Sequence, residues 1–336
     1  MVAGSLLMMI VGCVRPSGYS EPISGMPKRF DGGTLPLEEY WRLKITLWPS
    51  TPHMVATRGL VVLTPLVPQR FILRALGVRN GHDEWQVTEE GFYGIRALAA
   101  DQERIFVGRN RNVVAYQASD GQLSWSMTLN IPDRTGYSFR VTSKLQVYVH
   151  PGDSSEIYNL DTASGDLSSV SRVHSIPDQE ARILESDSQE YRLLEDRGGR
   201  YTLRSVDTTS GQLNWEWAMP SSLKYTPEII GQRMFLNFGT EIVDLDLSKG
   251  RPAWSMSADT KIVSNLALGE HSGCFLQKDA ILTCLDLTNG NTIGQVRFHP
   301  AVNPSYVEGY WVLVHEEMIL IYFGDSGEIV ALGPSR

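Results

Sequence analysis

Cysteine is scarce in this chain of 336 residues, in which Cys13, Cys274 and Cys284 are the three cysteines and no C-x-x-C pair occurs. Three scattered cysteines are too few for a four-cysteine zinc or iron–sulfur site. The seven histidines form no H-x-H, H-x-x-x-H or H-E-x-x-H pattern. The sequence therefore predicts no metal site and no cofactor site.

The chain also has no long apolar run and no excess of positive charge. No hydrophobic run reaches the roughly 20 residues that a membrane-spanning helix needs. The net charge of -8 and the pI of about 5.4 argue against nucleic acid as a partner. We expect the one compact basic spot, Arg109-Asn110-Arg111, to be a solvated hairpin tip. The adjacent pairs Glu38-Glu39, Glu89-Glu90 and Glu316-Glu317 are expected to be solvated loop charges.

Motifs of nucleotide and nucleophile chemistry are missing as well. No G-x-S-x-G, Walker loop or dinucleotide fingerprint stands in a strand–turn–helix context. Hydrophobic residues at 42% and charged residues at 20% nevertheless describe an ordered globular chain. Its length exceeds what one compact core usually holds, so a core divided among repeats is favoured.

Most of the chain consists of one repeated sequence unit. A run of β-forming residues, a small-residue turn that ends in glycine and, often, a tryptophan four residues later recur seven times. The spacings between successive glycines are 40, 44, 46, 39, 40 and 37 residues. The glycines are Gly81, Gly121, Gly165, Gly211, Gly250, Gly290 and Gly327. A period of this size is the signature of a repeat architecture.

One repeat, residues 226–258, shows the expected unit. It contains four short runs of β-forming residues separated by turns, among them 231–232, 238–240 and 248–250. Residues 241–247 alternate apolar and polar, as a half-buried strand should. Four short antiparallel strands in every ~40 residues form a β-propeller blade. The sequence therefore predicts an all-β propeller of four-stranded blades.

The repeated phrase resembles that of the pyrroloquinoline-quinone-type (PQQ-like) propellers, roughly Ala-x-Asp-x-x-Thr-Gly-x-x-x-Trp. Residues 75–85, 115–125, 205–215 and 244–254 carry its tryptophan, at Trp85, Trp125, Trp215 and Trp254. The other three copies have Ser169, Gly294 and Ala331 at that position. The resemblance covers about residues 38–332. It implies that the tryptophans and the seven glycines dock neighbouring blades and that the repeated Asp braces the turn.

Closure of the ring and the number of blades follow from the ends of the repeat region. Residues 40–47 read as an orphan outer strand with a tryptophan, while the last repeat ends in a short strand without one. We expect the N-terminal strand to complete the last blade, because this pairing protects exposed strand edges. Seven blades are predicted, and eight if one blade is degenerate.

The N-terminus is interpreted as a processing segment. Residues 2–12 form a short apolar stretch, and Ile10-Val11-Gly12-Cys13 resembles a bacterial lipobox, although the segment before it lacks Lys and Arg. On this interpretation Cys13 is lipidated. A plain signal peptide or a buried apolar strand is the alternative. The expected domains are 1–13 as signal peptide and lipobox, 14–37 as a tether rich in Pro, Gly and Ser, and 38–336 as the propeller.

Cys274 and Cys284 flank a predicted hairpin. If its turn centres on Asp279, the two cysteines lie opposite each other and could form a disulfide after export. A shift of one residue in the pairing would put them on opposite faces. Two buried thiols are then the alternative.

The favoured function is a non-catalytic protein-interaction scaffold, exported, lipid-anchored at the cell envelope and monomeric. The chain resembles the propeller lipoproteins of the outer-membrane assembly machinery, and the loops 130–137 and 174–188 are its candidate partner-binding segments. A small-ligand binder or quinone-dependent oxidoreductase that uses the central channel is the alternative. The quinone enzymes of the family carry a disulfide between adjacent cysteines, which this chain lacks. A sensor ectodomain is a third interpretation.

Overall fold

The computed structural model of the chain is all-β in the part that it describes. The described residues are 30–33, 37–45, 54–65, 67, 69–90, 95–132, 137–149, 154–174, 180–186, 189–195, 199–207, 210–298, 310–324 and 326–334. Among these residues we find no helix, and hence none that is long and apolar enough to cross a membrane.

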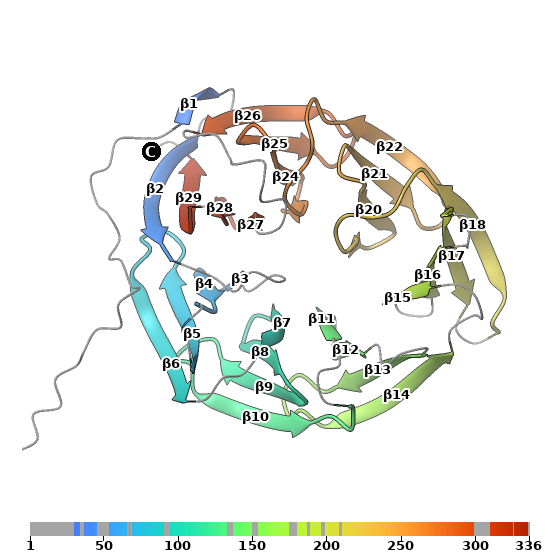
Figure 1. Cartoon of the computed structure of the whole chain (residues 1–336), viewed down its shortest axis with the longest axis horizontal. Helices are drawn as coiled ribbons and strands as arrows, with labels where there is room; N and C mark the ends of the chain where they lie inside the picture. Colours follow the sequence, from blue (N-terminus) through green and yellow to red (C-terminus); the bar gives the residue numbers. More distant parts are fainter. Residues whose placement is uncertain are drawn as a thin grey trace, which may run out of the picture.

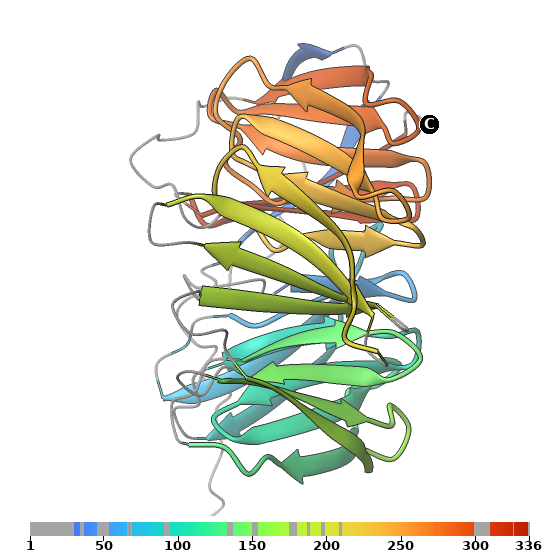
Figure 2. The same ribbon diagram turned by 90° about the vertical axis from the view of Figure 1, so that its right-hand side faces the viewer.

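The strands form seven antiparallel sheets arranged in a ring (Figure 1). Each sheet is a blade whose first strand lies near the centre of the ring and whose last strand lies at the rim. Seen edge-on, the blades form a thick disc (Figure 2). The predicted propeller is confirmed, with seven four-stranded blades and not eight.

The first four blades, from the centre to the rim, are made of consecutive strands. Blade 1 contains β3 (Met54–Thr57), β4 (Leu60–Leu63), β5 (Arg70–Gly77) and β6 (Asp83–Glu90). Blade 2 contains β7 (Ile95–Ala100), β8 (Arg104–Arg109), β9 (Asn112–Gln117) and β10 (Leu123–Thr128). Blade 3 contains β11 (Tyr137–Val141), β12 (Leu145–Val149), β13 (Ser154–Leu160) and β14 (Leu167–His174). Blade 4 contains β15 (Glu180–Ser186), β16 (Gln189–Glu195), β17 (Tyr201–Asp207) and β18 (Leu213–Met219).

The remaining blades include both ends of the described part of the chain. Blade 5 contains β19 (Glu228–Ile230), β20 (Arg233–Asn237), β21 (Glu241–Asp246) and β22 (Arg251–Ser257). Blade 6 contains β23 (Ala267–Leu268), β24 (Ser272–Gln277), β25 (Ile281–Asp286) and β26 (Thr292–Phe298). Blade 7 contains β27 (Trp311–His315), β28 (Met318–Phe323), β29 (Glu328–Pro334) and, at the rim, β2 (Leu37–Lys44).

Burial explains the composition of each strand position. The two middle strands of a blade are covered on both faces by the neighbouring blades, so they are almost continuously apolar, as in Ile105–Val107 of β8 and Val113–Tyr116 of β9. The rim strands β6 and β22 instead alternate between half-buried and exposed residues. This difference is expected when only one face of a strand reaches the core.

The N-terminal strand closes the ring, as predicted. β2 pairs antiparallel with β29, with Trp41 opposite Ala331 and Arg42 opposite Val330. The strand covers residues 37–44, three residues earlier than the predicted start at 40. The first and last segments of the propeller therefore share one blade.

A short strand, β1 (Phe30–Gly33), adds a fifth strand to blade 6. It pairs antiparallel with β26, with Phe30 opposite Phe298 and Asp31 opposite Arg297. The sequence assigned these residues to the tether, so the last part of that segment lies on the propeller. Cys13 and the rest of the signal and tether region before residue 30 lie outside the described residues.

Candidate functional site: the junctions between blades

Five tryptophans join successive blades in one repeated arrangement. Each lies on a rim strand and packs on a glycine in the turn before the next rim strand. At all five of these glycines a Cβ atom would lie under 3.0 Å from the indole. The pairs are Trp41 with Gly81, Trp85 with Gly121, Trp125 with Gly165, Trp215 with Gly250 and Trp254 with Gly290.

The same five indoles donate a hydrogen bond to the next blade. Each Nε1–H reaches the carbonyl oxygen three residues before the glycine, at 2.7–2.9 Å. The acceptors are Val78, Ala118, Thr162, Leu247 and Leu287. A buried indole needs one such partner for its N–H group. We call this arrangement of glycine turn and carbonyl the indole socket.

The geometry of the rim strands explains the regular placement of the tryptophans. In every blade the pairing of the rim strand with its neighbour shifts by one residue just before the tryptophan position. A β-bulge of this kind bends the strand and re-aims the following side chain. The register also shows that Ser169 and Gly294 occupy the tryptophan position in blades 3 and 6, because they lie opposite Asn159 and Cys284.

The structure corrects the predicted equivalence of the seventh glycine. Gly327 lies between β28 and β29, the second and third strands of blade 7, whereas the other six glycines precede a rim strand. Its carbonyl accepts a hydrogen bond from Ile45, as that of Arg111 does from Leu129 in the equivalent turn of blade 2. The prediction failed because the final rim strand comes from the N-terminus, so the last turn of the chain is a different one. Ala331 is accordingly not a missing tryptophan but the residue beneath Trp41.

The repeated aspartates accept hydrogen bonds inside the glycine turns. Hydrogen bonds from the backbone of Ser164, and then of Ala163, lower the pKa of Asp161. The Lys249 side chain, followed by Ser248, lowers the pKa of Asp246 to about 2. These carboxylates lie on separate blades and act as turn braces.

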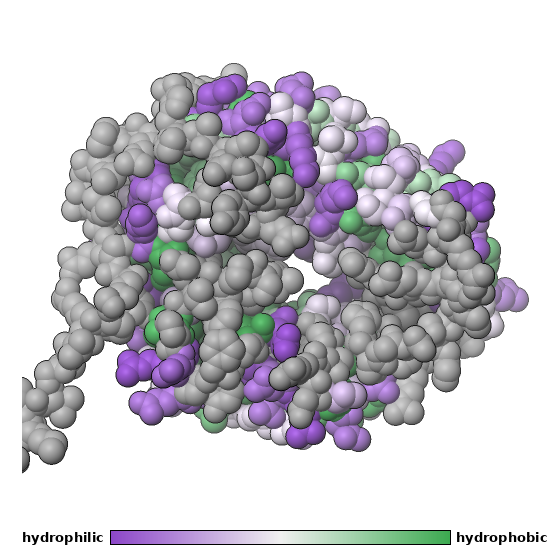
Figure 3. Space-filling model, in the orientation of Figure 1, coloured by the Kyte–Doolittle hydropathy of each residue, from purple (hydrophilic) through white to green (hydrophobic). Residues whose placement is uncertain are grey.

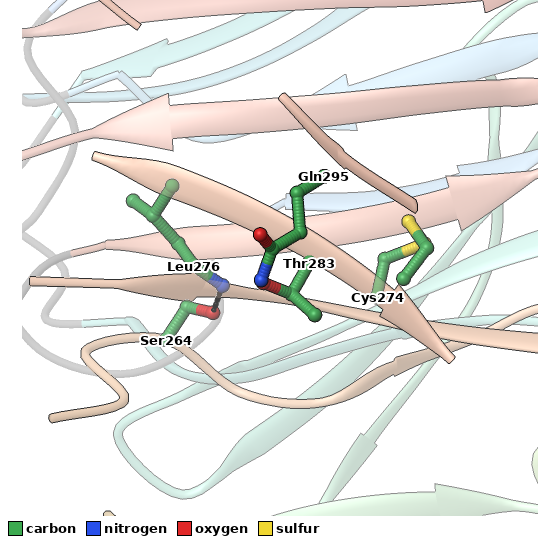
Figure 4. Close-up of a disulfide and its surroundings, with 6 residues drawn as sticks. Ser264, Cys274, Leu276, Thr283 and Gln295 are labelled. Atoms are coloured by element: carbon green, nitrogen blue, oxygen red, sulfur yellow. Dashed lines mark hydrogen bonds between the residues drawn. A yellow bond between two sulfur atoms is a disulfide. The ribbon is translucent and has the colours of Figure 1, made fainter. Parts of the chain in front are cut away.

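In the described part of the chain, the junction between blades 6 and 7 has no rim tryptophan and no glycine turn to receive one. Gly294 stands in place of the tryptophan, and Gly327 does not precede the rim strand β2 of blade 7. Cys274 and Cys284 lie opposite each other and are joined, with an S–S distance of 2.04 Å and a Cα–Cα distance of 4.1 Å (Figure 4). Both are buried in the apolar cluster shared by blades 6 and 7.

The disulfide lies in the same cross-strand row of side chains as Gly294, which takes the tryptophan position of blade 6. Cys284 lies opposite Gly294 on one side and Cys274 on the other. In blade 2 the corresponding row reads Trp125, Ala115 and Phe106. The two sulfur atoms thus supply apolar volume in the row where blade 2 has the ring of Trp125 and blade 6 has Gly294.

At the junction between blades 3 and 4, the row of side chains at the tryptophan position of blade 3 is polar, while Tyr148 and Ile157 form a separate buried apolar pair. Here the row reads Ser169, Asn159 and Gln146, and the three side chains are linked by hydrogen bonds of 3.1 Å. Apolar clusters join the other six pairs of neighbouring blades, but among the described side chains none joins blades 3 and 4.

Three groups of charges that were expected to be solvated each contain a residue with a structural role. Arg109 on β8 forms an ion pair with Glu89 on β6 and lies over the ring of Phe71, so it joins blades 1 and 2. Burial alone would raise the pKa of Glu89, but hydrogen bonds from Arg109 and Tyr116 outweigh it and lower that pKa. Glu39 is likewise paired, with the buried Arg42. The sequence could not show these contacts, because each joins residues on different strands or across a bulge.

The predicted partner-binding loops are only partly loops. Residues 180–186, inside the predicted loop 174–188, form β15, the innermost strand of blade 4. This strand was missed because its sequence, Glu-Ala-Arg-Ile-Leu-Glu-Ser, has little apolar alternation. In the loop 130–137, Ile131 is buried, and residues 133–136 lie outside the described part.

The innermost strands surround the centre of the ring, where the space-filling view shows an opening (Figure 3). These strands carry Arg96, Arg140, Glu228 and His315. Although Glu228 is itself solvent-exposed, desolvation by the surrounding protein raises its pKa to about 7, and the charge of Arg140 opposes the shift. Among the described residues no three His, Cys, Asp or Glu side chains form a metal-binding group. The geometry here assigns no reaction.

Comparison with known proteins places part of this chain in a recognised repeat. Residues 69–192, from blade 1 into blade 4, match the family model described as outer membrane protein assembly factor BamB. No curated protein matches the sequence.

Two solved structures are similar in fold. The crystal structure of BamB from Moraxella catarrhalis is 15% identical, with 82% of each chain covered and a TM-score of 0.49. The computationally designed protein Ika8 is 11% identical, with 92% of this chain and 100% of that chain covered and a TM-score of 0.53. At these identities the likeness concerns the fold alone. The repeated motif, the seven-bladed ring and the family match over residues 69–192 together show that the chain resembles the PQQ-like propellers of the BamB type.

Proposed function

We propose that this protein is an exported, lipid-anchored, non-catalytic propeller that holds protein partners at the cell envelope. The observation that carries the proposal is the match of residues 69–192 to the family model of an outer membrane protein assembly factor. The assignment of the repeated residues agrees with this role. The tryptophans, the turn glycines and the turn aspartates all serve packing or turn formation.

The partner test is affinity purification of the full chain from membranes after crosslinking. A protein partner recovered in constant ratio, with a propeller that is monomeric by light scattering when purified alone, is the expected result. Recovery of a stoichiometric small molecule with a visible absorption band and no protein would instead support the ligand-binding or quinone-dependent alternative.

The anchor is tested separately at Cys13. Metabolic labelling with a radioactive fatty acid should label the wild-type protein and place it in the membrane fraction, while Cys13→Ala should be unlabelled. Equal membrane association and equal labelling of the two proteins would refute lipidation at this residue.

A further inference from the structure

One rim strand of this propeller already carries an added strand. β1 pairs antiparallel with the outer edge of β26 in blade 6, with Phe30 opposite Phe298 and Asp31 opposite Arg297. The backbone N–H and C=O groups along the outer edge of a sheet can pair with a further strand. The rim of a blade in this ring therefore accepts a fifth strand.

The rim strand of blade 3, β14, matches β26 around the tryptophan position. Ser169 takes that position in β14 and Gly294 takes it in β26. Three residues further along, Arg172 corresponds to Arg297, the residue opposite Asp31 of β1. The other five rim strands carry the tryptophan and have no arginine three residues after it. β14 is therefore the rim strand that resembles the accepting strand at both positions.

The outer edge of β14 is free and partly apolar. In the part of the chain that the structure describes, no strand pairs with this edge. Leu167 and Val170 are 45% and 42% exposed, and β14 is the only described strand with two exposed large hydrophobic side chains. Both lie on the side of blade 2, because they are opposite Leu160 and Tyr158, which are buried against that blade. An edge strand with exposed apolar residues is a template for pairing with another chain.

The remaining rim edges are less suited to a partner strand. Charged side chains and proline at an edge discourage strand pairing. β6 has four carboxylates among its eight residues, β2 has four charged residues, and β22 begins with Arg251 and Pro252. β10 and β18 each have one exposed large hydrophobic side chain, Leu123 and Leu213 respectively. The free edge with the most exposed apolar surface is thus that of β14.

The charges along β14 indicate what a complementary strand would contain. Asp166 directly precedes the strand, and Arg172 is its one arginine, lysine, aspartate or glutamate. An antiparallel strand with an acidic residue opposite Arg172 and a basic residue opposite Asp166 is electrostatically complementary. β1 follows the same rule in blade 6, since its register places Asp31 opposite Arg297.

We propose that the outer edge of β14 binds an extended segment of a partner protein, which joins blade 3 as an antiparallel fifth strand. Main-chain hydrogen bonds provide the affinity, and apolar side chains beside Leu167 and Val170 provide the specificity. In the partner segment an acidic residue precedes these apolar residues and a basic residue follows them. The inference rests on the proposed scaffold function and names the surface and the kind of segment that it holds.

A labelled peptide tests the edge on the purified full chain. The probe is fluorescein-labelled Phe-Asp-Thr-Val-Thr-Val-Lys. Its valines are placed opposite Val170 and Leu167, with allowance for the one-residue shift in the pairing of β14. Fluorescence anisotropy should show saturable binding. Absence of binding at any accessible peptide concentration would overturn the proposal.

Two control peptides distinguish strand pairing from simple apolar contact. One carries N-methyl groups on its odd residues and the other on its even residues. Because an antiparallel strand directs alternate N–H groups toward its neighbour, one of the two should bind about ten-fold more weakly than the probe and the other about equally. Equal affinity of all three peptides would contradict an added strand.

Three variants locate the binding. Leu167→Lys and Val170→Lys place a charge at exposed positions of β14 and should each weaken peptide binding about five-fold. Leu123→Lys is the matched control, because Leu123 is also exposed and begins the rim strand β10 of the neighbouring blade. It should leave peptide binding unchanged, and all three variants should keep the melting temperature of wild type. Unchanged binding in both β14 variants would overturn the assignment.

Crosslinking in membranes separates this inference from the proposed function. If Leu167→Lys recovers a protein partner with the same yield as wild type, the scaffold function stands and the edge of β14 is refuted as its docking surface. If wild type recovers no protein partner although peptide binding depends on Leu167, the scaffold function is refuted and the edge remains a strand-binding surface.

Discussion

Single residues decide how each junction of the ring is packed, and the glycine turns show this most directly. Gly165 and Gly211 share a positive φ, yet only Gly165 lies against an indole. The same substitution at the two sites therefore separates the cost of backbone strain from the cost of a steric clash.

We predict that Gly165→Ala destabilises the protein more than Gly211→Ala does. In both variants, an alanine in the left-handed conformation lowers the free energy of unfolding by about 1–2 kcal/mol. Gly165→Ala also places a methyl group 2.6 Å from the ring of Trp125, which adds about 1–3 kcal/mol of overpacking. Urea denaturation measures the difference in the free energy of unfolding. Equal losses would contradict a steric clash between the added methyl group and Trp125.

The turn aspartates predict the acid sensitivity of the fold. Because the pKa of Asp246 is lower in the folded protein than its ordinary value, its stabilising contribution is present above about pH 4 and is lost as the pH falls toward about 2. The melting temperature of wild type should therefore exceed that of Asp246→Asn most clearly above pH 4. The gap should shrink toward pH 2, and a gap independent of pH would contradict this account.

At the scale of elements, the predicted and the observed strands agree best in the middle of each blade, where neighbouring blades cover both faces of a strand. The middle strands were predictable because their apolar runs lie between glycine turns, as in Ile105–Val107 and Val113–Tyr116. The innermost strand β15 was not predictable, because its sequence has little apolar alternation and resembles a loop. The position of Gly327 was misjudged because a local motif does not reveal which strand is supplied by the other end of the chain.

The candidate site was predictable only in part. The tryptophan and glycine positions stand out in the sequence, but the pairing of each tryptophan with the glycine of the next blade depends on the three-dimensional ring. The register confirms that Ser169 takes the tryptophan position of blade 3, opposite Asn159.

The disulfide in blade 6 is expected to strengthen an element that has no indole. Closing a loop of this length, with a sequence separation of 10, contributes about 2–3 kcal/mol by the chain-entropy model. A phosphine reductant should lower the free energy of unfolding of wild type by this amount. It should have no effect on the double variant Cys274→Ala, Cys284→Ala. Mass spectrometry of the unreduced protein that finds both thiols free would refute the bridge.

At the scale of the whole molecule, the ring is closed by charge as well as by strand pairing. Arg42 on β2 is buried and is bonded to both Glu39 and Glu328, and Glu328 lies on the C-terminal strand β29. Breaking such a buried pair leaves a carboxylate without its counterion in a poorly solvated place.

Arg42→Ala should therefore lower the free energy of unfolding by about 3–5 kcal/mol. Arg204→Ala is the matched control, because its ion pair with Glu216 is largely exposed and should cost about 1 kcal/mol or less. Urea denaturation of both variants checks the prediction. Similar losses in the two variants would show that Arg42 does not hold the ring closed.

The added strand β1 determines where the N-terminal segment joins the disc. The 16 residues between Cys13 and Phe30 reach at most about 55 Å even when fully extended. With a lipid on Cys13, the segment would tether the disc by the edge of blade 6 and keep that edge within this distance of the bilayer. The junction of blades 3 and 4 lies across the ring from β1 (Figure 1). The rims of blades 3 and 4 would then be the part of the disc farthest from the point of attachment.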